Sequence, residues 1–357
     1  MASSVSVMVV PRERFSAQPR TLQRVAATVP AGVEVVVVDA GSPPAIAAWT
    51  RAFCAARGWT LIRSDAPLMP NAARNLALER LGGELIVTID NDATPDDGWI
   101  EALVECAEAT GAAMVGPLTL IGRRADGVIH MAGGACRVEN RCGARFLFES
   151  HHLITRTLAD AKGELARART EHIDLHAALV RRDFVAGGFD EGYLVTGEHI
   201  DLCLRAGERG AAVFHEPRAV VTYGGNAPMT WRDLRLFALR WNDDWTMRSL
   251  LHLQRRWALA ADDPYLVAHA AWCARNRREG SLWWREALAR GFARRGRDID
   301  ADDVDVMLQR RALDAWHAAT TTSTTPPPHV ATARARAAAP SLAPAQRTPR
   351  RAGARAR

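Results

Sequence analysis

The stretch ELIVTIDNDATPDDGW, residues 84–99, decides the fold and raises the first question about function. Residues 85–89 are apolar apart from Thr88, as in a strand that is buried on both faces of a parallel sheet. The triplet Asp90-Asn91-Asp92 then ends the run with two carboxylates and an amide. Because ligands of parallel α/β sheets bind beyond the carboxyl ends of the strands, these charges indicate a ligand site.

Apolar strands alternate with amphipathic helices on both sides of this stretch. Strands are predicted at residues 5–10, 33–38, 59–65, the start of 84–99, and 112–118. Helices are predicted at residues 21–28, 46–57, 70–80 and 99–110. This alternation predicts an α/β domain with a mostly parallel central sheet that helices flank.

The second half of the chain is less regular. The pattern weakens between residues 120 and 170, which predicts an irregular segment. A strand at 176–181 and a helix at 198–208 follow, and residues 211–223 predict a strand, a break at Pro217 and a second strand. We expect three parts: an α/β domain over 1–230, a tryptophan-rich helical extension over 231–319, and a disordered Arg/Ala/Pro-rich tail over 320–357.

The net charge of +6 is a property of the C-terminal end. From Thr320 onward the chain has seven arginines and no acidic residue, so the remainder sums to −1 (+6 minus +7). This distribution argues against a nucleic-acid partner. No apolar run approaches the roughly 20 residues of a membrane span, and no basic start of a signal peptide precedes residues 5–10. We expect a cytoplasmic protein without a transmembrane segment, with peripheral contact at the inner membrane face left open.

The cysteines predict free thiols, because none of the six forms a C-x-x-C pair. One combination was weighed as a zinc site: Cys136 and Cys142 with His151 and His152. Its spacing fits no common ligand pattern.

Asp90 and Asp92 are the first candidate site residues. Two carboxylates at positions i and i+2 can both approach a hard divalent cation such as Mg²⁺ or Mn²⁺. The alternative is an Asx turn followed by a helix cap, since Asp and Asn favour both positions.

A second set of candidates lies near other element ends. Asp39 follows a predicted strand and is either a solvated strand end or an acceptor for ribose hydroxyls or a base edge. Asn71, Arg74 and Asn75 lie at a helix start, where free N–H groups favour anions, although Arg74 also suits a helix surface.

The third set is Glu198, His199 and Asp201, which open a helix after Gly197. A carboxylate there can act as a general base toward an attacking hydroxyl. Helix capping is the alternative, but a cap needs only one such residue.

The order of these motifs resembles the family 2 glycosyltransferases, whose fold is the nucleotide-sugar-binding domain called GT-A. The resemblance covers roughly residues 5–225. It rests on five stretches in order: SVMVVPRERF, VEVVVVDAGSP, PNAARNLAL, VTIDNDATPDDGWIEAL and VRRDFVAGGFDEGYLVTGEHIDLCLRAGERGAAVFHEP. It implies a nucleoside diphosphate sugar donor, an acceptor hydroxyl, and a direct displacement that inverts the anomeric carbon. By matching position, Asp39 would contact the nucleoside, and Asp90 and Asp92 the nucleotide and its metal.

The chain departs from the family pattern at two places. The family commonly carries Glu-Asp where this chain has Glu198-His199, so the base is Glu198, His199 or Asp201, with Glu198 favoured. Many members carry a metal-binding histidine where this chain reads VVTYGG. Three histidines are candidates to line the site instead, His130, His176 and His215, with a purely structural role as the alternative for each.

The expected acceptor is a growing surface glycan or a lipid-linked saccharide. The tryptophans after residue 231 pack a subdomain, form an acceptor platform or contact a membrane surface. Two other functions stay open. One is a metal-dependent hydrolase built from the EHIDLH and EHID segments, and the other is a nucleotide-sugar-binding protein without catalysis. A dehydrogenase is disfavoured because Pro11 follows the first strand where a glycine-rich turn is required.

Overall fold

A computed structural model of the chain describes residues 3–122, 127–161, 163–224, 229–321 and 330–331. Its strands are β1 (Val5–Val10), β2 (Glu34–Ala40), β3 (Thr60–Ser64), β4 (Leu85–Asp90), β5 (Ala93–Pro95), β6 (Met114–Ile121), β7 (Val128–Met131), β8 (Gly134–Arg141), β9 (Ala144–His151), β10 (Ala168–Arg169), β11 (Ala177–Arg181), β12 (Val213–Tyr223) and β13 (Val330–Ala331). Its helices are α1 (Gln18–Thr28), α2 (Pro44–Ala55), α3 (Pro70–Leu78), α4 (Trp99–Thr110), α5 (Leu158–Ala161), α6 (Glu198–Glu208), α7 (Leu234–Arg240), α8 (Asp243–Trp257), α9 (Pro264–Ala293) and α10 (Ala301–Thr321).

One mixed sheet organises the described residues, in the order β10-β12-β6-β11-β4-β1-β2-β3-β13, with β5 on β12 and β7 on β6. The strands β3, β2, β1 and β4 run parallel, and Val7 of β1 lies beside Val35 of β2 and Val87 of β4. β11 runs antiparallel between β4 and β6, while β6 and β12 are parallel. The predicted α/β fold with a mostly parallel core is confirmed.

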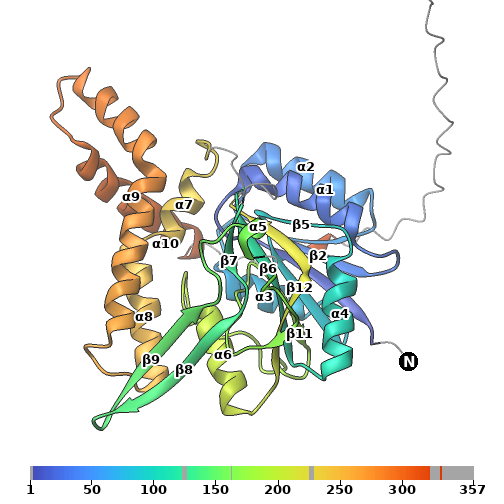
Figure 1. Cartoon of the computed structure of the whole chain (residues 1–357). Helices are drawn as coiled ribbons and strands as arrows, with labels where there is room; N and C mark the ends of the chain where they lie inside the picture. The colour runs from blue at the N-terminus through green and yellow to red at the C-terminus, as the bar shows by residue number, and fades with distance from the viewer. Residues whose placement is uncertain (1–2, 123–126, 162, 225–228, 322–329, 332–357) are drawn as a thin grey trace, which may run out of the picture.

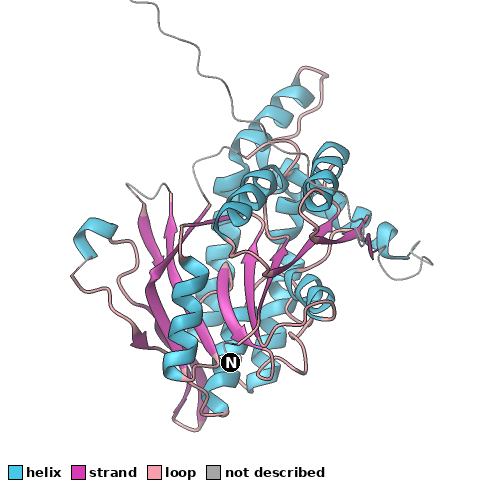
Figure 2. Cartoon of the chain, turned by 90° about the vertical axis from the view of Figure 1, so that its right-hand side faces the viewer, coloured by secondary structure: helices cyan, strands magenta, loops and turns pink. Residues whose placement is uncertain are grey.

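Helices cover both faces of the sheet (Figures 1 and 2). On one face Leu22 of α1, Cys54 of α2 and Trp99 of α4 pack on buried strand residues. On the other face Ala73 of α3 packs on β1 and β2, and Ile200 of α6 packs near β11. Since both faces are covered, the central strands are apolar at nearly every position, which is why they predict a parallel core.

The C-terminal helices α7–α10 gather at one side of the sheet (Figure 1). They fill the segment predicted to be helical, and the boundary at residue 230 stays a prediction. None of the helices in the described ranges has the length and hydropathy of a membrane span. Of the predicted tail, only residues 320–321 and 330–331 are described, and the short β13 pairs with β3. The rest of residues 320–357 lies outside the described part of the chain.

Two local predictions were wrong. Residues 134–151 form the regular hairpin β8–β9 and not an irregular segment. The strand β12 continues through Pro217 and does not break, because a register shift between Glu216 and Val220 accommodates the proline within the pairing with β6.

Candidate active site

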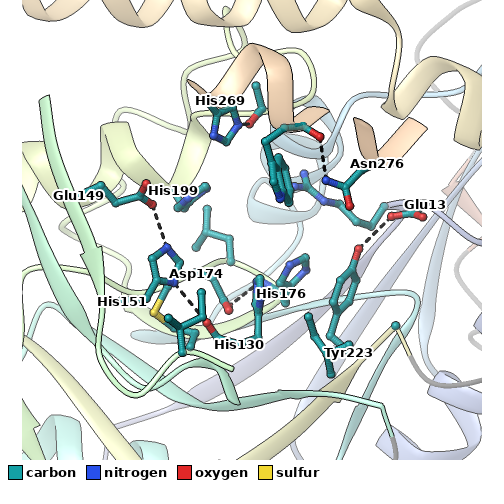
Figure 3. A pocket seen from close by; sticks show the side chains of 18 of the residues that line it. Glu13, His130, Glu149, His151, Asp174, His176, His199, Tyr223, His269 and Asn276 are labelled. Atoms are coloured by element: carbon teal, nitrogen blue, oxygen red, sulfur yellow. Dashed lines mark hydrogen bonds and ion pairs between the residues drawn. The ribbon is translucent and has the colours of Figure 1, made fainter. Parts of the chain in front are cut away.

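A cavity of about 630 Å³ lies at the carboxyl ends of the parallel strands. Arg12 and Arg14 follow β1, Ile121 ends β6 and Tyr223 ends β12, and all four line it. The remaining wall comes from β7, β9, the segment before β11, the start of α6 and the helices α7 and α9. Figure 3 shows side chains from these elements pointing into the same space. The position agrees with the rule that ligands bind beyond the carboxyl ends of strands.

Only two of the predicted site residues line this cavity. Glu198 and His199 line it. The others lie outside its lining: Asp39, Asn71, Arg74, Asn75, Asp90, Asp92 and Asp201. The predicted residues therefore lie at the edge of the sheet where this cavity is found, but several acidic and amide side chains turn into the protein behind the cavity wall. Their functional roles stay a prediction.

Asp90 is the centre of a buried ionic network. Its Oδ1 accepts a hydrogen bond from Arg74 Nη2 at 3.2 Å, and its Oδ2 lies 2.9 Å from His176 Nδ1 and 3.7 Å from Arg12 Nε. Burial raises the pKa of Asp90 to about 6, although Arg74 and Arg12 act in the opposite direction. Asp90 thus holds Arg12 and His176 in place at the cavity wall and Arg74 behind it.

Asp92 differs from Asp90 because both of its carboxylate oxygens are buried without a hydrogen-bond partner. Burial raises its pKa well above the usual value, and the negative charges of Asp90 and Glu13 raise it further. Asn91, between the two acids, accepts a hydrogen bond from the backbone N–H of Arg12 at 2.9 Å. The triplet therefore anchors the segment that follows β1.

Glu198 and His199 are placed by the start of α6. Gly197 precedes them with φ of 84°, a left-handed conformation that glycine tolerates, and so turns the chain into the helix. Glu198 accepts a short hydrogen bond from Arg12 Nη1, and its other oxygen, Oε2, is buried without a partner. Burial alone would raise the pKa of Glu198, but the charges of Arg12 and Arg74 lower it below its usual range. Burial lowers the pKa of His199 well below its usual value, so its ring is neutral at neutral pH.

Asp201 lies one turn further and away from the cavity. Its Oδ1 accepts hydrogen bonds from Tyr193 Oη at 3.1 Å and Trp257 Nε1 at 3.0 Å. It therefore joins α6 to the end of α8.

The predicted donor-binding residues make internal contacts. Asp39 accepts hydrogen bonds at Oδ2 from Ser42 Oγ and Arg63 Nη1, both at 2.8 Å. Asn71 Nδ2 donates to the carbonyl of Asp190 at 2.7 Å, and Asn75 Nδ2 to that of Phe189 at 2.9 Å. These two amides fix the loop that leads to α6.

Histidines are concentrated in the cavity wall: His130, His151, His176, His199 and His269. Within the described residues two groups bring potential metal ligands within 4.8 Å of one another: His130 with Asp174 and His176, and Glu149 with His172 and His199. Neither group contains a cysteine. Of the pair weighed for zinc, Cys136 is buried and Cys142 is exposed.

Several cavity residues were not identified from the sequence. Arg12 follows β1 at the same edge as Asp90, a position that could have identified it. Arg240 of α7 lines the cavity, and its Nε and Nη1 are buried without hydrogen-bond partners. No local pattern distinguishes Arg240 from other helix residues. Two of the tryptophans considered above as an acceptor platform, Trp241 and Trp272, meet edge to face at 5.5 Å on the same wall, and their role stays a prediction.

Part of the chain is similar to a known protein family. The model of glycosyl transferase family 2 matches residues 6–159, less than half of the chain. Two curated relatives from two strains of Mycobacterium tuberculosis, both named pre-mycofactocin glycosyltransferase, are each 26% identical over 196 residues. The aligned part makes up 54% of this chain and 37% of theirs, so this chain spans well under half the length of those relatives.

Solved structures with a similar fold include a mannosyltransferase, PcManGT from Pyrobaculum calidifontis, in complex with GDP-Man and Mn²⁺. It has 17% identity and a TM-score of 0.46, and the alignment covers 91% of this chain and 89% of that one. GalNAc-T7 with UDP, GalNAc and Mn²⁺ has 15% identity and a TM-score of 0.48, over 63% of this chain and 45% of that one.

Proposed function

The chain contains a glycosyl transferase family 2 domain over residues 6–159, and from this premise we propose that the protein transfers a glycosyl group from a nucleoside diphosphate sugar to an acceptor hydroxyl. The observation that carries the proposal is the cavity of about 630 Å³ at the carboxyl ends of the strands of that domain. Its volume falls in the range of small-molecule sites. Its wall also combines three kinds of side chain. Cations suit a diphosphate, carboxylates suit the reacting hydroxyl, and aromatic rings suit a sugar.

Arg240 is our candidate for the group that binds the diphosphate. Its guanidinium is buried, two of its nitrogens lack partners, and it faces the cavity. Burial and the nearby charge of Arg12 lower the pKa of Arg240, which marks an uncompensated positive charge. An anion bound beside it would supply the missing partners and would be stabilised as charge develops on the leaving group.

The reaction follows as a single displacement. The acceptor oxygen forms a bond to the anomeric carbon while the bond from that carbon to the diphosphate oxygen breaks, and the electron pair leaves with the diphosphate. The proton of the acceptor hydroxyl passes to a base in the wall. Glu198 offers the unpartnered Oε2 and His199 offers a neutral ring, whereas Asp201 Oδ1 already accepts hydrogen bonds from Tyr193 and Trp257. Attack from the side opposite the leaving group inverts the anomeric carbon.

The acceptor side of the cavity is aromatic. Trp241, Trp272 and Asn276 line it from the C-terminal helices, beyond the residues that the family model matches. Aromatic faces pack on the apolar face of a sugar ring, and an amide can hydrogen-bond to its hydroxyls. We therefore propose a saccharide acceptor, free or lipid-linked, in glycan synthesis.

A divalent cation, Mg²⁺ or Mn²⁺, stays part of the proposal. Asp92 suits a cation because its buried oxygens lack hydrogen-bond partners. Asp90 suits it less well, since its oxygens already face Arg74 and His176. Neither acid belongs to a group of three or more potential ligands within the described ranges. When bound, such an ion adds positive charge near the diphosphate, and no step above depends on it.

The test is a panel of nucleoside diphosphates and their sugars, measured by thermal melting with and without Mn²⁺ or Mg²⁺. One nucleotide should raise the melting temperature, because a ligand at 100 times its Kd stabilises the native state by about 2.7 kcal/mol. Release of the nucleoside diphosphate should then require a saccharide acceptor. Release that is independent of acceptor would favour the hydrolase, and binding without release would favour the non-catalytic protein. The absence of a shift with any nucleotide would contradict the proposal.

A further inference from the structure

Three potential metal ligands meet on one wall of the cavity, and they come from two separate segments of the chain. His130 lies in β7, while Asp174 and His176 lie two residues apart just before β11. Their ligand atoms all lie within 4.8 Å of one another, and all three side chains line the cavity (Figure 3). We infer that His130, Asp174 and His176 form a binding site for a divalent transition-metal ion.

Asp174 carries the strongest sign of a missing cation. Its side chain is 5% exposed. Its Oδ1 accepts the backbone N–H of His176 at 3.1 Å, but its Oδ2 is buried without a hydrogen-bond partner. The hydroxyl of Thr119 lies near this carboxylate but forms no hydrogen bond of acceptable geometry with Oδ2. A buried carboxylate oxygen that faces a cavity and lacks a donor suits a metal ion.

His176 is oriented as metal-binding histidines usually are. Its Nδ1 lies 2.9 Å from Asp90 Oδ2, and its ring stacks on Tyr223 at 3.7 Å. When Nδ1 donates its proton to Asp90, the lone pair of Nε2 is the one that His176 offers to a cation. A carboxylate behind a ligating histidine fixes its tautomer and makes it a better ligand. This gives Asp90 a supporting role behind the metal site.

His130 is the third residue of this group and comes from the strand β7. Pairing of β7 with β6 places it at the cavity, and its ring centre lies 5.4 Å from that of His176. The backbone carbonyl of His130 also lies 3.2 Å from His151 Nδ1. This hydrogen bond links the strand to the hairpin and helps to hold the position of His130.

Two imidazoles and one carboxylate favour a borderline transition metal, such as Zn²⁺, Co²⁺, Mn²⁺ or Fe²⁺, over Mg²⁺ or Ca²⁺, which prefer oxygen ligands alone. Three protein ligands leave coordination positions that can face a substrate. The second group, Glu149 with His172 and His199, is a weaker candidate because Glu149 Oε1 already lies 3.1 Å from His151 Nε2.

The metal site is inferred from geometry alone, and only its role rests on the proposed function. In that role the ion would lie in the cavity where the diphosphate is proposed to bind and would add positive charge to its surroundings. The metal site and the transferase activity can therefore fail separately in experiment.

The test is titration of the metal-stripped full chain with Co²⁺, followed by visible absorption, with Zn²⁺ as a competitor. We expect one Co²⁺ per chain with ligand-field bands, and displacement by Zn²⁺. Asp174→Asn and His130→Gln should weaken binding by at least roughly 10- to 100-fold, the loss seen when even supporting residues of metal sites are changed. Circular dichroism and thermal melting confirm that each variant is folded.

Two control variants change other residues that line the same cavity. His269→Gln removes a histidine that bonds to Thr196 Oγ1 at 2.7 Å, and Glu149→Gln changes the second group. Both should bind Co²⁺ as the wild type does. Absence of stoichiometric Co²⁺ binding would overturn the inference, and so would loss in Glu149→Gln with normal binding in Asp174→Asn. Nucleotide binding measured separately reports on the proposed function and not on the metal site.

Discussion

Glu198 holds a buried negative charge at the cavity wall, and Arg12 keeps that charge in place. If Glu198 is the base, Glu198→Gln should lower the rate of transfer by about 10²- to 10⁴-fold, because the acceptor proton then has no carboxylate to receive it. Nucleotide affinity should stay unchanged, since Glu198 is not proposed to contact the donor. Initial rates and calorimetric titration with the nucleoside diphosphate measure the two effects. His199→Gln is the comparison: a large loss there, with full activity in Glu198→Gln, assigns the base to His199.

Arg240 is buried beside the ring of Trp241, with its guanidinium carbon 4.3 Å from the ring centre. Arg240→Met should raise the melting temperature of the ligand-free protein, because it removes a buried charge that lacks full compensation. The same change should weaken nucleotide binding by about 10- to 100-fold, the equivalent of a charged hydrogen bond worth 1.5–3 kcal/mol. Thermal melting without nucleotide measures the change in stability, and melting with increasing nucleotide measures the change in binding.

Arg277→Met is the contrast for that experiment. Arg277 is also buried, but it pairs with Asp305 at 2.9 Å and with Asp243. Its replacement should lower the melting temperature and leave the nucleotide-induced shift intact. If Arg240→Met behaved in the same way, Arg240 would be a structural residue and not an anion ligand.

His215 allows a clean test of pH dependence. It is buried outside the cavity lining, and burial lowers its pKa to about 4. Between pH 6.5 and about 4 the unfolded chain therefore binds a proton that the native protein does not, so the wild type loses stability as pH falls through this window. His215→Gln does not titrate. The free energy of unfolding of the variant relative to the wild type should rise by up to about 1.4 kcal/mol per pH unit on acidification.

Urea unfolding at several pH values between 7 and 4.5 measures this difference. Comparing the two proteins removes the contribution of other groups, such as Asp90, whose raised pKa acts in the opposite direction. A difference that stays constant over the window would show that His215 binds its proton equally well in the native and unfolded states, and would contradict the lowered pKa.

At the scale of elements, Asp201 links α6 to α8 through Trp257 and supports Tyr193. Asp201→Ala leaves two buried donors unpaired, at a cost of about 1–3 kcal/mol each. We expect a lower melting temperature and an unchanged kcat at a temperature where the variant is folded. A large loss of kcat without a loss of stability would instead return Asp201 to the candidate bases.

The elements that sequence predicts best are those whose signals are local. The helices Trp99–Thr110 and Glu198–Glu208 have the predicted bounds, because a glycine with positive φ precedes each of them. The β8–β9 hairpin was missed for an equally local reason. Its two-residue turn is Cys142-Gly143, both with positive φ, and a cysteine at this position does not carry the Asn-Gly or Asp-Gly signal of such turns.

At the scale of the whole molecule, the site could be predicted only in part. The acidic ends of strands lie at the same edge of the sheet as the cavity, although Asp39, Asp90 and Asp92 do not line it. The partners that decide their roles are far away in sequence: Glu198 meets Arg12 across 186 residues, and Asp90 meets His176 across 86. Such pairings depend on the packing of the complete sheet, and no local pattern records them. For the same reason Arg240 could not be assigned before the position of α7 was known.

The helix α9 completes the cavity on the side away from the family-matched residues, so it should determine the acceptor and not the donor. Trp272 of α9 lines the cavity against Trp241, whereas Trp283 on the same helix is 40% exposed outside its lining. Trp272→Ala should raise the KM for the acceptor by about 2- to 10-fold, the equivalent of an aromatic contact worth 0.5–1.5 kcal/mol, without changing nucleotide affinity. Trp283→Ala should change neither value. Equal effects of the two substitutions would mean that α9 acts only by supporting the fold, and the acceptor would then have to bind elsewhere in the cavity.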